Sequence, residues 1–183
     1  MNLQMNEIHE VLIDMDGVIA DFEAGVAMLT GSTIESIQEN GRWEEFKKEL
    51  PGLKHFAMLP AMPLISVLKK YPGCYTICTA AGKTETKSVI SQKTEWIKSV
   101  IGEGVPILFT ERSKHKAQYA TPNTLLIDDR TKSLIPFSNA GGKILHYKAT
   151  EEQDLFIEGI LASMEPVWEI KKNDSAKWGT PKF

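Results

Sequence analysis

The sequence predicts an α/β fold built on a doubly wound parallel sheet of five strands, and two observations favour it. Five short apolar runs are rich in Ile, Leu and Val without clean polar alternation, which is typical of strands that are covered on both faces. Helical patterns lie between most of these runs, and this alternation indicates parallel strands joined by helical crossovers. With 183 residues, the chain is long enough for one domain with a small insertion.

The predicted elements follow one another with a single interruption. The predicted strands cover residues 9–15, 74–79, 106–110, 124–129 and 142–147. Residues 64–71 and 87–102 carry apolar side chains at helical spacing, and Gly102 is suited to end the second helix. About sixty residues separate the first two strands, too many for one crossover helix. We therefore expect a core of residues 1–21 and 63–165, a small helical cap of residues 22–62 inserted after the first strand, and a polar C-terminal tail of residues 166–183.

Composition and charge argue against a protein that binds nucleic-acid polymers or spans a membrane. A net charge of −3 and a pI near 5.8 argue against binding of nucleic-acid polymers. No apolar segment reaches the ~18 residues of a membrane span, and the first residues do not resemble a signal peptide. Cys74 and Cys78, on one predicted strand, would lie roughly 13 Å apart, too far for a disulfide. We expect two buried thiols in a reducing compartment, with the cytoplasm as the location and no membrane partner.

Acidic and hydroxyl side chains gather where three predicted strands end. Asp14 and Asp16 follow the first strand, and Thr79 ends the second. Asp128 and Asp129 end the fourth. In open parallel sheets ligands bind outside the carboxyl ends of the strands, so these side chains are expected to share one site.

Such a group of carboxylates requires a cation. Oxygen ligands without nearby His or Cys favour a hard ion, above all Mg²⁺, which often also binds a substrate phosphate. A lysine-rich loop, "ERSKHKAQY", precedes the fourth predicted strand and can supply further positive charge. The pattern therefore predicts a phosphoryl-transfer site in which an aspartate attacks phosphorus.

Four motifs of the chain, taken in order, resemble those of the haloacid dehalogenase superfamily of phosphohydrolases. They are "DMDGV" followed by "ADF", the strand that ends in Thr79, the lysine of the loop, and "LLIDDR". More narrowly, "VLIDMDGVIADFEAG", "ICTA" and "LIDDR" resemble the 5'(3')-deoxyribonucleotidase family, including its phage and bacterial relatives. The resemblance runs from about Val11 to His146. It implies a Rossmann-like core, Mg²⁺ as cofactor and a deoxynucleoside monophosphate as substrate.

The resemblance also assigns roles to the acids. Asp14 would be the nucleophile that forms an aspartyl-phosphate and would also bind the metal. Asp16 would act as general acid and then as base, and would meet the metal through its backbone carbonyl. Asp128 would be the carboxylate ligand of Mg²⁺ from the fourth motif, and Asp129 would support the metal site beside it.

Phosphate would be held by groups from the other motifs. Thr79 and the backbone N–H of Ala80 would bind its oxygens, and Gly17 would let the backbone approach it closely. Lys114 and Lys116 both fit the third motif, and Lys116 is preferred because "KAQYA" resembles the start of the family's lysine-led helix. Relatives often have "CTSP" where this chain has "CTAAG", so Ala80 keeps the N–H but lacks a hydroxyl.

The predicted cap would cover the site and contact the leaving group. Phe22 and Phe56 are the candidates to stack on a nucleobase. The expected partner is a small phosphate ester, and a homodimer is left open. Two alternative functions also stay open: the same chemistry on another small ester or on a nucleic-acid 3'-phosphate, and a phospho-accepting signalling receiver.

Overall fold

Five parallel strands form one sheet in the computed structural model, which describes residues 7–166. The strands are β1 (Glu10–Ile13), β2 (Thr76–Ala80), β3 (Ile107–Thr110), β4 (Thr124–Asp128) and β5 (Lys143–His146). Their order across the sheet is β3-β2-β1-β4-β5, and each neighbouring pair is parallel. The predicted doubly wound parallel sheet is therefore confirmed. All but the first residue of the predicted tail, 166–183, lies outside the described residues.

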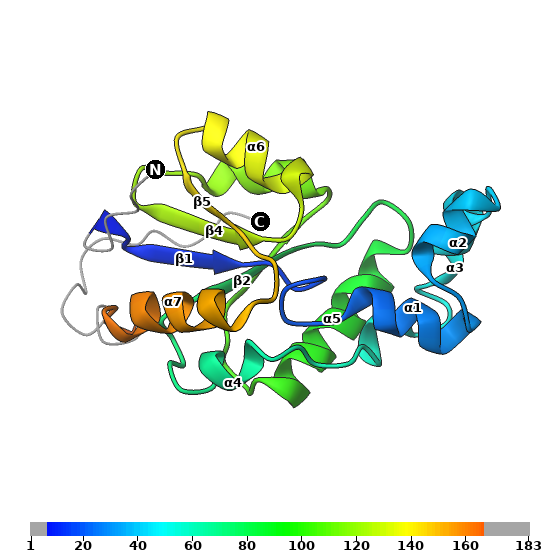
Figure 1. Ribbon diagram of the computed structural model, residues 1–183, viewed down its shortest axis with the longest axis horizontal. Coiled ribbons are helices and arrows are strands. Elements are labelled where there is room, and N and C mark those ends of the chain that lie inside the picture. The colour runs from blue at the N-terminus through cyan, green and yellow to red at the C-terminus, as the bar shows by residue number, and fades with distance from the viewer. Residues whose placement is uncertain (1–6, 167–183) are drawn as a thin grey trace.

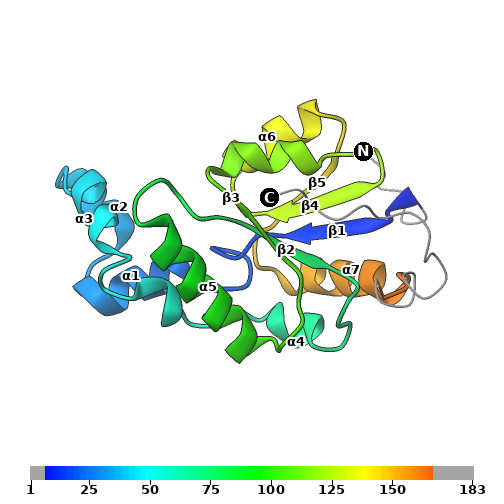
Figure 2. The same cartoon turned by 180° about the vertical axis from the view of Figure 1, so that it is seen from behind.

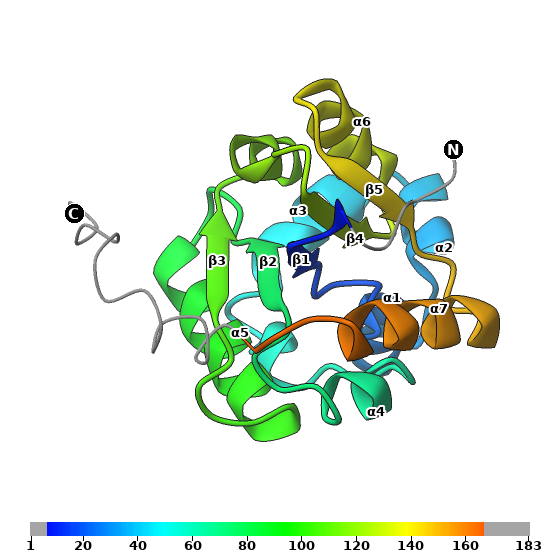
Figure 3. The same cartoon turned by 90° about the vertical axis from the view of Figure 1, so that its left-hand side faces the viewer.

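Helices cover both faces of this sheet (Figure 1). One face carries α4 (Ile65–Leu68), α5 (Thr86–Val100) and α7 (Glu151–Ala162). The other face carries α6 (Thr131–Asn139) and the 3₁₀ helix η3 (Ser113–Tyr119). The end-on view in Figure 3 shows the sheet as the middle of three layers.

The burial of β1 explains why the apolar runs lack polar alternation. Val11, Leu12 and Ile13 are all at most 1% exposed. Because successive side chains of a strand point to opposite faces, Leu12 packs in the cluster beneath α6, whereas Val11 and Ile13 pack in the larger cluster on the other side. A strand that is buried on both faces has no solvent-facing position for a polar residue.

The long connection between β1 and β2 forms a separate group of short helices, which we call the insert (residues 22–62). It contains α1 (Phe22–Thr30), α2 (Ile34–Glu39), α3 (Trp43–Glu49) and the 3₁₀ helix η2 (His55–Ala57). Figures 1 and 2 show α1, α2 and α3 at one end of the molecule, past the carboxyl end of β1.

The two ends of the insert lie side by side. Ala20 and Ala61 form an antiparallel bridge. The N–H of Asp21 donates to the carbonyl of Pro60 at 2.8 Å, and the N–H of Met62 donates to that of Ile19 at 2.9 Å. The chain therefore leaves the core and returns to it at one place, next to the carboxyl end of β1.

Two local predictions differ from the structure. Helix α4 ends at Leu68 rather than at residue 71, and Pro72 disfavours helical conformation at Tyr71. Cys74 precedes β2 instead of lying on it; both it and Cys78 are buried, and no disulfide joins them. Within residues 7–166, no helix is both long and apolar enough to cross a membrane.

Candidate active site

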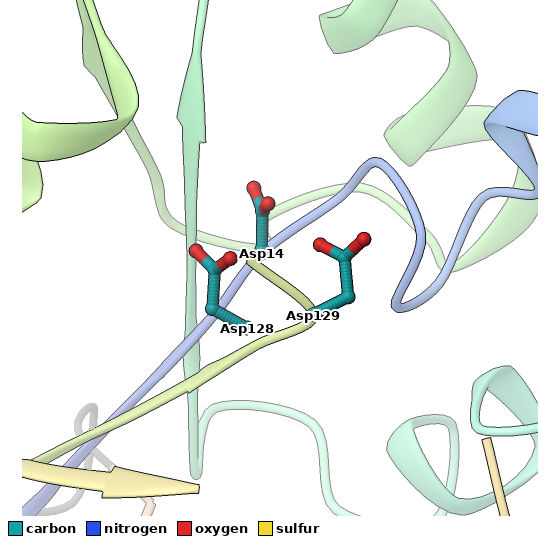
Figure 4. Close-up of side chains that lie close together, drawn as sticks. All are labelled: Asp14, Asp128 and Asp129. Carbon is teal, nitrogen blue, oxygen red and sulfur yellow. The ribbon is translucent and has the colours of Figure 1, made fainter. Parts of the chain in front are cut away.

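Three aspartates meet where the order of the strands reverses, between β1 and β4. Asp14 directly follows β1, Asp128 ends β4 and Asp129 comes next, and in Figure 4 their side chains lie close together and point to the same side. One oxygen from each lies within 4.8 Å of the others. Asp14 is 5% exposed and Asp128 is fully buried. The site therefore lies in the crevice where open α/β sheets bind ligands.

Lys116 joins two of these acids. Its Nζ lies 2.7 Å from Asp14 Oδ1 and 2.6 Å from Asp128 Oδ2, and its side chain is 1% exposed. Burial alone would lower the pKa of Lys116, but the two carboxylates outweigh it and raise the pKa above its usual value. Lys114, on the same 3₁₀ helix, is exposed and lines a surface groove with Arg112. Of the two candidate lysines, the structure thus brings Lys116 to the acids.

Gly17 provides space for the third acid. Its φ is +79°, and a Cβ at this position would lie 2.4 Å from Asp129 Oδ2, so any side chain would collide with that carboxylate. Burial, followed by repulsion from Asp14 and Asp128, raises the pKa of Asp129 to about 7. The neighbour that requires a glycine here is therefore Asp129, while close approach of a phosphate remains a prediction.

The three-acid cluster fits a hard divalent cation. Its donors are all carboxylate oxygens, and Asp129 Oδ1 is buried without a hydrogen-bond partner among the described residues. Burial and the nearby Asp14 also raise the pKa of Asp128, and a bound cation would favour the ionised form instead. Asp14, Asp128 and Asp129 are thus suited to hold Mg²⁺. The carboxylate of Asp16 is not part of this cluster.

Three further predicted residues, Asp16, Thr79 and Ala80, are linked by a second lysine. Lys93 Nζ donates to Asp16 Oδ2 at 2.6 Å, to Thr79 Oγ1 at 2.8 Å and to the carbonyl of Ala80 at 3.0 Å.

Lys93 is absent from the residues predicted from the sequence. A signal was present, because Lys93 follows Val89 by four positions and precedes Trp96 by three, so it lies on the apolar stripe of its helix.

Phe22 and Phe56 belong to a small aromatic group on the insert. Their ring centroids lie 6.2 Å apart, and the ring of His55 stands edge-to-face to both, at 4.8 Å from Phe22 and 5.2 Å from Phe56. Lys93 Nζ lies 5.0 Å from the centroid of the Phe56 ring. The structure therefore places both predicted stacking residues together, beside the lysine that reaches Asp16.

His55 is the polar member of this group. It is 1% exposed, and its Nε2 is buried with no hydrogen-bond partner within residues 7–166. Burial, followed by the charge of Lys93, lowers the pKa of His55 to about 4. The ring is accordingly neutral near pH 7 and packs as an aromatic side chain.

Replacing His55 with phenylalanine is expected to change how stability depends on pH. The usual pKa is 6.5, so below that pH the unfolded chain takes up a proton that the folded chain does not bind until about pH 4. His55 therefore lowers the free energy of unfolding as pH falls from 6.5 to 4, by about 3 kcal/mol in total.

Urea unfolding between pH 4 and pH 8 measures this contribution as a difference between wild type and His55→Phe. The variant should lose less stability on acidification, and His55→Leu should behave in the same way if the larger ring does not fit. Equal pH dependence in all three proteins would show that His55 binds a proton in the folded state.

A phage protein resembles this chain along most of its length. The chain is 31% identical over 154 residues to a protein of Vibrio phage KVP40 named "Putative 5'(3')-deoxyribonucleotidase", covering 80% of this chain and 79% of that protein. No protein-family model matches the chain.

Two solved structures resemble the fold at low sequence identity. A hydrolase from Streptococcus pneumoniae TIGR4 aligns with 83% of this chain and 99% of its own, with a TM-score of 0.50 and 14% identity. A haloacid dehalogenase superfamily hydrolase of subfamily IA from Geobacter sulfurreducens PCA aligns with 84% of this chain and 97% of its own, with a TM-score of 0.48 and 15% identity.

Proposed function

This chain belongs to the 5'(3')-deoxyribonucleotidase family, and from that premise we propose that it hydrolyses deoxynucleoside monophosphates with Mg²⁺ through an aspartyl-phosphate on Asp14. The observation that carries the proposal is the contact of Lys116 with both Asp14 and Asp128 at the reversal point of the sheet. A nucleophile, a cation and a metal ligand are thereby held together on a rigid edge, as in-line phosphoryl transfer requires.

Asp14 is the nucleophile in this proposal. Its Oδ1 accepts from the N–H of Met15 at 2.8 Å and pairs with Lys116, so Oδ2 is the oxygen left to attack. Oδ2 forms a bond to phosphorus while the bond from phosphorus to the leaving oxygen breaks. The electron pair of that bond stays on the leaving oxygen.

The phosphoryl oxygens are held by positive charge and by hydrogen bonds. Thr79 and the N–H of Ala80 would bind them from the end of β2, and Lys116 would offset their charge. When bound by Asp14, Asp128 and Asp129, Mg²⁺ would supply further positive charge for these oxygens.

Asp16 handles the protons. It gives a proton to the leaving oxygen as the aspartyl-phosphate forms, and then takes one from the water that attacks this intermediate. The second step restores the proton that the first removed and releases inorganic phosphate, so the enzyme returns to its starting form.

The insert serves as a cap in this proposal. It lies past the carboxyl end of β1, where the acids are, and it brings Phe22 and Phe56 together. A planar base bound against these rings would explain why a small group of helices suffices for a nucleotide.

Phosphate release from a panel of esters tests the function. We expect the purified protein to release inorganic phosphate from deoxynucleoside 5'- or 3'-monophosphates when Mg²⁺ is present. EDTA should abolish release, and added Mg²⁺ should restore it.

Because the folded acids must be ionised to bind the ion, Mg²⁺ should also raise the melting temperature more at pH 8 than at pH 5.

The same panel separates the alternatives. Faster release of phosphate from a sugar phosphate or from a 3'-phosphorylated oligonucleotide would show that this ester is the preferred substrate. The proposed reaction through Asp14 would be unchanged. Stable phosphorylation of the protein without turnover would instead indicate a receiver. The sheet already differs from that class, because receivers have the strand order 2-1-3-4-5 and this chain has β3-β2-β1-β4-β5.

A further inference from the structure

We propose that Lys93 is a positioning residue that fixes which oxygen of Asp16 carries the proton to the leaving group. The inference rests on the proposed phosphatase chemistry and adds to it a residue outside the four motifs described above. Three observations support it: the hydrogen bonds of Lys93, the absence of a partner at Asp16 Oδ1 within residues 7–166, and the packing of α5.

The ammonium group of Lys93 is fully used. It has three N–H donors, and its three acceptors are Asp16 Oδ2, Thr79 Oγ1 and the carbonyl of Ala80, all within 3.0 Å. Its side chain is 0% exposed, so water does not compete for these bonds. Lys93 therefore holds Asp16 at a fixed place relative to the end of β2.

This contact distinguishes the two oxygens of Asp16. An ammonium group donates hydrogen bonds and accepts none, so the oxygen 2.6 Å from Lys93 must be the acceptor. Whenever Asp16 is protonated, the proton consequently sits on Oδ1. That oxygen has no hydrogen-bond partner within residues 7–166, so it is available to a partner on a bound substrate.

The leaving oxygen of a phosphate ester is such a partner. As the bond from phosphorus to this oxygen breaks, the oxygen gains an electron pair and takes the proton from Oδ1 of Asp16. Asp16 is left ionised, with Lys93 beside its other oxygen to stabilise the new charge.

Helix α5 holds Lys93 in place through its neighbours. Gln92 Nε2 donates to the carbonyl of Pro51 at 2.8 Å, and Trp96 Nε1 donates to that of Leu59 at 2.7 Å. The face of Phe56 lies against the ammonium group. The same face of α5 therefore joins the insert to the core. Among the described residues of this face, Lys93 is the one whose side chain bonds to Asp16.

Leaving groups that differ in their need for a proton test the proposal. A nucleoside alkoxide or a phenolate needs protonation to depart, whereas p-nitrophenolate is stable without it. In Lys93→Met we expect kcat for deoxynucleoside monophosphates and for phenyl phosphate to fall about 10²-fold or more, with KM changed less than about threefold. The single-turnover release of p-nitrophenolate should stay within about fivefold of wild type.

Three further variants control the experiment. Asp16→Asn should show the same dependence on the leaving group. Ser91→Ala removes an exposed hydrogen bond from the same helix without touching Asp16 or the insert, and it should keep the wild-type ratio between substrates. Lys93→Gln retains N–H donors, should lose less activity than Lys93→Met, and provides the comparison if that variant does not fold.

Equal losses on all three esters, or a raised KM at constant kcat, would overturn the proposal, because they would make Lys93 a phosphate ligand or a purely structural residue. The comparison of phenyl with p-nitrophenyl phosphate does not depend on nucleotides. A wild-type protein that fails on nucleotides but cleaves aryl phosphates would therefore contradict the proposed substrate and leave the role of Lys93 measurable.

Discussion

Asp14→Asn is expected to reduce turnover at least about 10⁴-fold with every substrate that the wild type accepts. The side chains have the same shape, but an amide is not a nucleophile that can form the phosphorylated intermediate. The variant should keep its fold, because Asn fills the same space and Lys116 retains its contact with Asp128. Phosphate release at saturating substrate, together with trapping of labelled phosphate on the protein, measures both the rate and the intermediate.

Asp129→Asn is the matched control for this prediction. Asp129 belongs to the same three-acid cluster but is not the proposed nucleophile. Its replacement should weaken Mg²⁺ binding, so activity should recover as Mg²⁺ is raised. Recovery of Asp14→Asn at high Mg²⁺ would mean that Asp14 is only a metal ligand and that another group attacks phosphorus.

Lys116→Met is expected to cause the largest loss of stability. The substitution leaves Asp14 and Asp128 buried side by side without their shared cation, which costs about 3–5 kcal/mol for a broken buried pair. Urea unfolding in EDTA measures the loss. Burial and the neighbouring Asp14 raise the pKa of Asp128, so the penalty should be largest at neutral pH and smaller in acid, where Asp128 becomes protonated.

Two comparisons make this result specific. Lys114→Met, on the same 3₁₀ helix but exposed, should change the free energy of unfolding by less than about 0.5 kcal/mol. Adding Asp128→Asn to Lys116→Met should recover part of the lost stability, because one of the two stranded charges is removed. Equal effects of the two single lysine variants would contradict the contacts of Lys116.

The sequence was most informative where burial and chain topology decide the structure. The apolar run of Val11 to Ile13 predicts a strand covered on both faces, and the helical patterns between the runs predict that the strands are parallel. The carboxyl ends of parallel strands share an edge, so the meeting of Asp14 with Asp128 also follows from the pattern.

The sequence was less informative where the contact of a single side chain on a helix or loop determines the geometry of the site. A lysine within a polar helix such as α5 is most often solvated, and only its place between Val89 and Trp96 sets Lys93 apart. From the sequence alone, Gly17 is expected to make room for a phosphate, because nothing in the sequence shows that Asp129 folds back against it. Both contacts join parts of the chain that are far apart in sequence, and local patterns do not report such contacts.

The bridge between Ala20 and Ala61 makes the insert a part of the chain that can be exchanged as a unit. Because the insert begins and ends at one point of the core, insertions, deletions or an entire replacement between these residues would leave the strand order and Asp14 where they are. Exchange of these forty or so residues for another helical segment is therefore expected to change which leaving group the protein accepts, while Asp14, Asp128 and Asp129 keep their places in the core.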